Sequence, residues 1–300
     1  MPFGMNPKGV RLRGTAAMMA ACGPEAHDPE PLKELRMYQS EIGMSTAALY
    51  PIYPTEDALT TAADLGFRVA EVFLQSEEEH SANFGVELDR RRRAAGIRVH
   101  SLHLHTHYFN LWTPYVRRAE ETRERFLRTL DLANRVEAQA LTWHGIGSQF
   151  GFQLLSAFMD SVALAAEHAH SAGVTLCIEN VSWCYLRTPE QVSALNNLGV
   201  PIGFTFDTFQ AGESHVDPIT LIHAMGAQLT TVHLADYGPT GPRHLPLGDG
   251  TLDWHTILRA LTDVDYPGPL IIELADVETL NTLTASRDFI SQMLRQDLQG

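Results

Sequence analysis

Acidic and imidazole side chains stand at the ends of four successive apolar segments in the second half of the chain. Glu179 closes the segment VTLCIE, and Asp207 closes IGFTFD. His233 lies near the end of LTTVHLAD, and Glu273 near the end of PLIIELA. Such side chains are costly to bury unless they are paired or bind a metal ion. Their recurrence in successive segments is improbable as packing alone, and a divalent cation explains it most simply.

The elements that must position these residues are short strands alternating with helices. From residue 38 onward, strand-forming segments alternate with segments whose apolar residues recur at helical spacing. We predict strands at 40–46, 69–75, 97–105, 138–145, 174–180, 201–207, 229–236 and 269–275. We predict helices around 56–65, 86–95, 115–136, 151–172, 189–198, 217–226, 254–263 and 278–297.

This alternation predicts an α/β fold, a (β/α)8 TIM barrel that forms one domain over residues 38–300. A doubly wound open sheet is the competing architecture. It would normally carry a glycine-rich phosphate turn after its first strand, where this chain has TAALYPIYP. Because barrel active sites lie at the carboxyl ends of the strands, further polar residues there become candidates: Glu71, His103, His105, His144, Asn180 and Asp236.

Composition excludes several classes of partner. Lys and Arg total 22 against 36 Asp and Glu, so the net charge is 22 − 36 = −14, which disfavours nucleic acid. No apolar run is long enough to span a membrane. Three cysteines without a CxxC motif favour a reducing cytoplasm.

Residues 1–37 read as a flexible leader, with lipid attachment at Cys22 as a weaker alternative. We read the arginines at 90–93 as a solvated helix face, and a homo-oligomer stays open.

Several motifs make residues 38–297 resemble the xylose-isomerase-like barrels. They are IEN at 178–180, FDTFQAG at 206–212, VHLAD at 232–236, RHLPLGDGTLDW at 243–254 and IIEL at 271–274. This superfamily includes ketose 3-epimerases, hydroxypyruvate isomerases, inosose dehydratases and type-four apurinic endonucleases. In its sugar enzymes, the residues that match Glu179, Asp207, His233 and Glu273 hold one divalent ion.

The resemblance implies a metal-dependent isomerase or epimerase that acts on a small carbohydrate, a sugar acid or a sugar phosphate. Glu179 and Glu273 would form the acid–base pair on opposite faces of the substrate. A metal would neutralise the enediolate formed when a proton next to a carbonyl is removed. Three carboxylates with one imidazole suit Mn²⁺ best, with Mg²⁺, Co²⁺ or Zn²⁺ as alternatives.

The same motifs match most of the endonuclease pattern. The ligands of its three-zinc cluster match His105, His144, Glu179, Asp207, His233, His244 and Glu273. Two further ligands are replaced by Gln210 and Pro242, so the third metal would keep only His244. A phosphodiester hydrolase with two metals, the second on His105, His144 and Glu179, is therefore an alternative. A non-catalytic metal- or sugar-binding barrel is another.

Substrate contacts are expected from the loops that follow the strands. The resemblance assigns them to His105 and His144, and places Gln210 where several ketose epimerases have a histidine. Arg243 and His244 lie in a loop rich in Gly and Pro, and could hold hydroxyls or a carboxylate. Aromatic residues that could wall a sugar pocket are Tyr108, Phe109, Trp112, Trp143 and Trp183, although Phe109 and Trp143 could instead plug the barrel.

Overall fold

The computed structural model describes residues 41–105, 109–150, 152–241, 243–275 and 280–296. The predicted leader, residues 1–37, lies outside this part of the chain. Within it, parallel strands pair in chain order, and the first pairs with both the second and the last. The strands are β1 (Ile42–Ser45), β2 (Val69–Leu74), β3 (Arg98–Leu104), β4 (Ala140–Trp143), β5 (Thr175–Glu179), β6 (Ile202–Asp207), β7 (Leu229–Leu234) and β8 (Leu270–Ile272).

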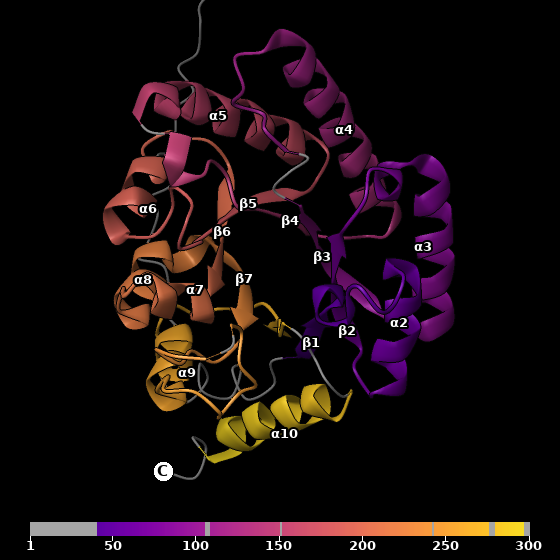
Figure 1. Cartoon of the computed structure of the whole chain (residues 1–300), viewed down its shortest axis with the longest axis vertical. Helices are drawn as coiled ribbons and strands as arrows, with labels where there is room; N and C mark the ends of the chain where they lie inside the picture. Colours follow the sequence, from indigo (N-terminus) through magenta and orange to yellow (C-terminus); the bar gives the residue numbers. More distant parts are fainter. Residues whose placement is uncertain (1–40, 106–108, 151, 242, 276–279, 297–300) are drawn as a thin grey trace, which may run out of the picture.

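This closure confirms the predicted (β/α)8 barrel and excludes the open sheet. The helices form a ring outside the strands (Figure 1). They are α2 (Thr55–Asp64), α3 (Ala82–Ala95), α4 (Val116–Arg135), α5 (Leu155–Ser171), α6 (Pro189–Asn196), α7 (Thr208–Glu213), α8 (Pro218–Met225), α9 (Trp254–Asp263) and α10 (Leu280–Gln296). Short 3-10 helices lie at Thr46–Leu49, Glu78–His80, Ser148–Phe150, Phe152–Leu154 and Gly226–Gln228.

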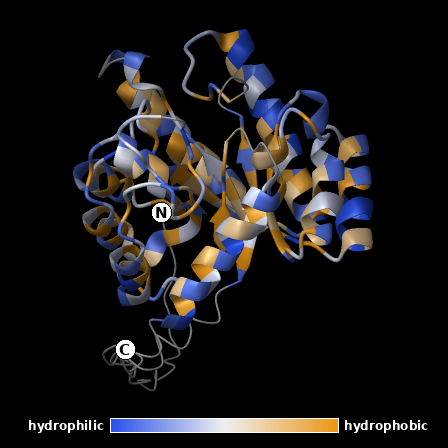
Figure 2. Cartoon of the chain, turned by 60° about the horizontal axis from the view of Figure 1, so that its bottom comes forward, coloured by the Kyte–Doolittle hydropathy of each residue, from blue (hydrophilic) through white to orange (hydrophobic). Residues whose placement is uncertain are grey.

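Burial follows the periodicity of each element. The strands are buried on both faces, because side chains point alternately into the barrel and towards the helices. In α9, Trp254, Ile257, Leu258 and Leu261 form one buried stripe at helical spacing. Figure 2 shows the same mixture of hydrophobic and hydrophilic residues along the outer helices. Packing of these stripes on the strands holds the strand ends, and therefore the site, in place.

The helix α7 was not predicted, because it is short and follows β6 without a loop. Asp207 ends β6 and caps α7, with its Oδ1 accepting a hydrogen bond from Gln210 N at 2.7 Å. One carboxylate oxygen of a predicted metal ligand is therefore occupied by the backbone.

The arginines at 90–93 lie on α3, in the outer layer of helices. Each forms an ion pair with a carboxylate at 2.6–3.0 Å, for example Arg90 with Glu87 and Arg91 with Asp57. Because neighbouring carboxylates neutralise them, these arginines do not form a free cationic patch. Arg90 and Arg93 are exposed, as the predicted solvated face requires, whereas Arg92 is buried. Among the described helices, none combines the length and apolarity that crossing a bilayer needs.

Candidate active site

Six buried ionisable residues converge inside the barrel near the carboxyl ends of the strands. Strand register explains part of this arrangement, because Asp207 on β6 pairs directly with His233 on β7. Glu273 directly follows β8, and its backbone N–H donates a hydrogen bond to Leu234 O on β7 at 3.0 Å. The members of the group are Glu71, His103, Glu179, Asp207, His233 and Glu273, all buried.

Three of the four predicted metal ligands lie around one atom of the fourth, Nδ1 of His233. This nitrogen is 3.1 Å from Glu179 Oε1, 2.7 Å from Glu273 Oε2 and 3.9 Å from Asp207 Oδ2. One ligand atom from each residue lies within 4.8 Å of the others. Such spacing allows a single cation to contact all four side chains.

Two observations indicate that this cluster could hold a cation. Although Glu273 Oε2 is buried and close to His233, it has no hydrogen-bond partner among the described residues. A buried carboxylate oxygen without a donor is unfavourable unless an ion neutralises it. The cluster also contains three carboxylates against one imidazole, so it carries an excess of negative charge. The residues present therefore fit a divalent cation of the type bound by oxygen-rich sites.

The pKa shifts within the cluster also favour positive charge at this position. Burial, together with the nearby carboxylates of Glu179 and Glu273, raises the pKa of Asp207 well above its usual range. Burial would lower the pKa of His233, but the surrounding carboxylates of Glu71, Glu273 and Glu179 raise it well above its usual value. The ion-free chain therefore favours retaining protons here, which a divalent cation would displace.

Asn180 aligns the two strands that carry Glu179 and Asp207. Its Oδ1 accepts a hydrogen bond from Asp207 N at 2.8 Å, and its Nδ2 donates to Asp207 O at 2.9 Å. The side-chain amide thus holds the end of β6 through both backbone groups of one residue. Asn180 is a positioning residue, whereas the sequence marked it only as a polar residue at a strand end.

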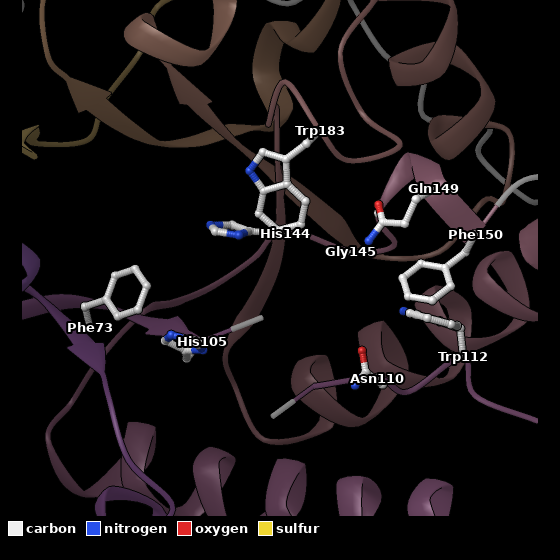
Figure 3. A pocket seen from close by; sticks show the side chains of 10 residues that line it. Phe73, His105, Asn110, Trp112, His144, Gly145, Gln149, Phe150 and Trp183 are labelled. Atoms are coloured by element: carbon white, nitrogen blue, oxygen red, sulfur yellow. The ribbon is translucent and has the colours of Figure 1, made fainter. Parts of the chain in front are cut away.

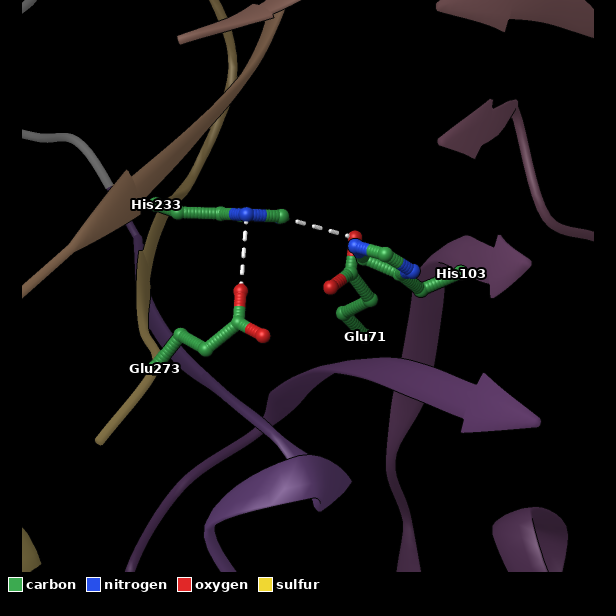
Figure 4. Close-up of side chains that lie close together, drawn as sticks. All are labelled: Glu71, His103, His233 and Glu273. Carbon is green, nitrogen blue, oxygen red and sulfur yellow. Dashed lines mark hydrogen bonds and ion pairs between the residues drawn. The ribbon is translucent and has the colours of Figure 1, made fainter. Parts of the chain in front are cut away.

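Glu71 contacts the other ring nitrogen of His233, and with His103, His233 and Glu273 it forms a further group whose potential ligand atoms lie within 4.8 Å of one another (Figure 4). Its Oε2 lies 3.0 Å from His233 Nε2 and also accepts a hydrogen bond from Ser101 Oγ at 2.8 Å. Burial would raise the pKa of Glu71, but the adjacent His233 lowers it to about 2. An ionised Glu71 keeps the proton of His233 on Nε2, which leaves Nδ1 free to bind a cation. The sequence marked Glu71 as a candidate, because it is a carboxylate within the apolar strand VAEVFL, but it predicted no role for this residue.

A second group of potential ligands shares Glu179. Glu179 Oε2 lies 3.1 Å from His103 Nε2 and 2.9 Å from His144 Nε2. The two oxygens of Glu179 therefore face two different groups, because Oε1 faces His233. This second group contains His103, whereas the sequence alternative placed His105 there. Burial would raise the pKa of Glu179, but His144 and His233 hold it well below its usual value.

A cavity of about 440 Å³ adjoins His144 (Figure 3). It contains three of the predicted substrate contacts, His105, His144 and Trp183. The Trp183 ring meets His144 edge-on, with centroids 5.6 Å apart. The full lining is Phe73, His105, Asn110, Trp112, His144, Gly145, Gly147, Gln149, Phe150 and Trp183.

Two other aromatic candidates lie inside the fold. Trp143 and Phe109 are almost completely buried, and Trp143 Nε1 donates a hydrogen bond to Phe109 O at 3.2 Å. They are not among the residues described as lining the cavity, which agrees with the plug alternative. Tyr108 and Pro242 lie outside the described residues.

The remaining predicted contacts gather around Phe209 and the loop that follows β7. Gln210 Oε1 accepts a hydrogen bond from Ser182 N at 2.9 Å, so it holds the backbone beside Trp183. His244 packs against Phe209 with centroids 4.2 Å apart, and burial lowers the pKa of His244. Arg243 stands over the same ring and pairs with Glu213 at 3.3 Å. None of these three belongs to the described cavity lining.

Asp236 organises the loop that carries Arg243 and His244. Its carboxylate accepts hydrogen bonds from Gly248 N and from Trp254 Nε1, both at 2.9 Å. Its backbone pairs with Leu245 in both directions. We therefore assign Asp236, which the sequence marked as a candidate, to positioning this loop.

Comparisons with known proteins agree with this geometry. The family model described as xylose isomerase-like TIM barrel matches residues 59–293. A D-tagatose 3-epimerase-like protein is 17% identical with a TM-score of 0.73, covering 85% of this chain and 97% of that chain. The D-psicose 3-epimerase from Clostridium cellulolyticum H10, solved with D-tagatose, is 17% identical with a TM-score of 0.70, covering 85% and 99%.

A third solved structure, 3-keto-D-glucoside 4-epimerase from E. coli, is 16% identical with a TM-score of 0.68 and covers 85% of this chain and 98% of that chain. No curated protein matches the chain in sequence. At these identities, the structural similarity establishes the fold.

Proposed function

Because the chain belongs to the xylose isomerase-like TIM barrel family, we propose that it is a metal-dependent sugar isomerase or epimerase. The observation that carries this proposal is the convergence of Glu179, Asp207 and Glu273 on Nδ1 of His233. It supports the proposal because two glutamates, which would form the acid–base pair, lie close to one candidate cation position. The similar solved structures support a carbohydrate substrate, since they include epimerases of ketoses and of a 3-keto-D-glucoside.

Glu179, Asp207, His233 and Glu273 would hold the metal, with Mn²⁺ as our first choice because the set is rich in oxygen. A bound divalent cation would supply positive charge beside the oxygen atoms of the substrate. Location in the cytoplasm is part of the proposal; the buried free thiols of Cys177 and Cys184 support it.

Glu179 and Glu273 would carry the proton. One carboxylate removes the proton from the carbon next to the substrate carbonyl, and the other returns a proton to the opposite face. Return to the same carbon inverts it, which is epimerisation; return to the neighbouring carbon moves the carbonyl, which is isomerisation. Their environments differ, because the two oxygens of Glu179 form ion pairs with three histidines, His103, His144 and His233, whereas the ion pair described for Glu273 is with His233 alone. This asymmetry supports separate roles for the two groups.

Proton exchange tests the proposal directly. Mn²⁺-loaded protein is incubated in D₂O with a panel of ketoses and 3-keto-glycosides, and deuterium at carbon is followed by NMR. We expect incorporation into at least one substrate, lost in Glu273→Gln. Absence of exchange across the panel, with Mn²⁺ bound, would argue against the proposal.

A second candidate, a two-metal phosphodiester hydrolase, is favoured by one observation: the group of His103, His144 and Glu179 adjoins the four-ligand cluster through Glu179. The net charge of −14 opposes it, because a polyanion would be repelled. We expect no cleavage of abasic duplex DNA with Zn²⁺ or Mn²⁺ at physiological salt. Robust nicking that is lost in His144→Ala would promote this alternative above the sugar enzyme.

A further inference from the structure

The cavity lies beside the four-ligand cluster rather than over it. Its described lining includes none of Glu179, Asp207, His233 or Glu273, yet it shares a wall with that group. The shared wall is His144, whose Nε2 is 2.9 Å from Glu179 Oε2 while its ring lines the cavity. A molecule held at the cluster can therefore extend past His144 into this space.

The far end of the cavity is aromatic. Trp112 and Phe150 lie with ring centroids 4.4 Å apart and with their planes 53° from parallel. Phe73 and Trp183 add two further rings to the wall. Rings of this kind stack on the C–H face of a sugar or on another aromatic ring. The volume of about 440 Å³ falls within the range typical of small-molecule sites, about 300–1,000 Å³.

Trp112 carries an unpaired donor. Its side chain is only 6% exposed, and Nε1 has no hydrogen-bond partner among the described residues. Buried indole N–H groups normally find an acceptor, and leaving one unpaired is unfavourable. In Figure 3 this nitrogen faces the cavity, as do the side-chain amides of Asn110 and Gln149. These groups match the hydroxyls or ether oxygens of a bound molecule.

The lining also determines the charge of that molecule. Its described members include no Lys, Arg, Asp or Glu. A phosphate or carboxylate would find no Lys or Arg among these described lining residues, and the net charge of −14 would oppose its approach. Neutral rings are favoured.

We propose that this cavity is a second subsite, which holds a neutral ring joined to the keto sugar at the cluster, so that the substrate is a keto-glycoside rather than a free ketose. This inference rests on the proposed function. The ring is an aryl group or a second sugar, since both stack on Trp112 and Phe150, and the experiment separates them.

Calorimetric titration of Mn²⁺-loaded protein tests the subsite without turnover. The probes are matched methyl and phenyl glycosides of D-glucose, D-galactose and D-mannose, together with cellobiose. We expect phenyl glycosides or cellobiose to bind at least tenfold more tightly than the matching methyl glycoside. A gain confined to phenyl glycosides assigns an aryl group, and a gain with cellobiose assigns a second sugar.

Three variants test which residues provide the gain in affinity. Trp112→Phe keeps a ring but removes the N–H, and Gln149→Ala removes an exposed amide whose loss threatens the fold less. Trp112→Phe and Gln149→Ala should each reduce the gain in affinity for a second sugar at least threefold. Trp112→Ala should abolish the gain in affinity for a second sugar and for an aryl group alike. Gln292→Ala is the matched control, because it removes an exposed amide on α10 that is not among the described cavity lining. Circular dichroism confirms folding.

Equal affinities within every matched pair, or no binding by any probe, would overturn the subsite. So would a gain that persists in both Trp112→Ala and Gln149→Ala. Failure of the proposed function has a different signature, because it abolishes deuterium exchange into all keto sugars while the binding gain for the larger glycosides remains.

Discussion

Oε2 of Glu71 lies 3.0 Å from Nε2 of His233, and the opposite nitrogen of the same ring faces Glu179, Asp207 and Glu273. A single imidazole thus connects a carboxylate on β2 with three carboxylates contributed by β5, β6 and the end of β8. The arrangement fixes which nitrogen carries the proton and which is available to a cation. We therefore expect Glu71 to act through His233.

Replacing Glu71 with Gln should weaken metal binding without unfolding the barrel. The amide keeps the shape but loses the charge that holds the His233 proton on Nε2. We expect the affinity for Mn²⁺ to fall about 10–100-fold, as is typical when a residue that orients a metal ligand is lost. Competition with a chelator measures the affinity, and Glu120→Gln on the exposed face of α4 is the control. Unchanged affinity in Glu71→Gln would contradict this role.

Glu179→Gln and Glu273→Gln should each reduce turnover by at least a thousandfold. Each change removes a metal-binding charge and one member of the proton-transfer pair. Circular dichroism should show a folded barrel, because Gln has nearly the same size and shape as the buried Glu it replaces. Deuterium exchange at saturating Mn²⁺ is the measurement. Near-normal exchange in either variant would exclude the two-glutamate mechanism.

Metal removal should abolish activity and lower thermal stability. Chelation should remove turnover, and Mn²⁺, Co²⁺ or Mg²⁺ should restore it. At 100 times the dissociation constant, an ion that binds only the folded chain adds about 2.7 kcal/mol, or about 5–10 °C in Tm. Calorimetry with and without Mn²⁺ checks this, and Asp207→Asn should lose most of the gain. Full activity in metal-free protein would contradict the proposal.

Acid should destabilise the fold partly through His100. Its ring is buried, with Nε2 3.2 Å from both Thr230 O and Thr231 Oγ1, and burial lowers its pKa to about 4. As pH falls from about 6.5, the unfolded chain gains the proton first. Stability contributed by the neutral ring is therefore present above pH 6.5 and decreases towards pH 4, by at most about 1.4 kcal/mol per pH unit.

Urea unfolding between pH 7 and 4 measures this effect. His100→Asn should be less stable at pH 7, because it loses buried packing, and should show a shallower decline with acid. Identical slopes in the two proteins would show that other groups cause the acid sensitivity.

The sequence by itself determined the barrel, and it grouped the four residues that lie together at the candidate cation position. Strands and helices are local patterns, and apolar runs such as VTLCIE show where a strand must be buried. Once eight such units are recognised, the residues at their carboxyl ends must converge. That is why Glu179, Asp207, His233 and Glu273 could be grouped without coordinates.

Only the tertiary structure decided which of two histidines faces Glu179. His103 and His105 are two residues apart, so strand alternation puts them on the same face and the sequence cannot separate them. Depth in the barrel places His103 against Glu179 and leaves His105 on the cavity wall. The pairing of Glu71 with His233 spans 162 residues and carries no local signal. Local periodicity determines each element, whereas contacts across the barrel depend on how all the strands close together.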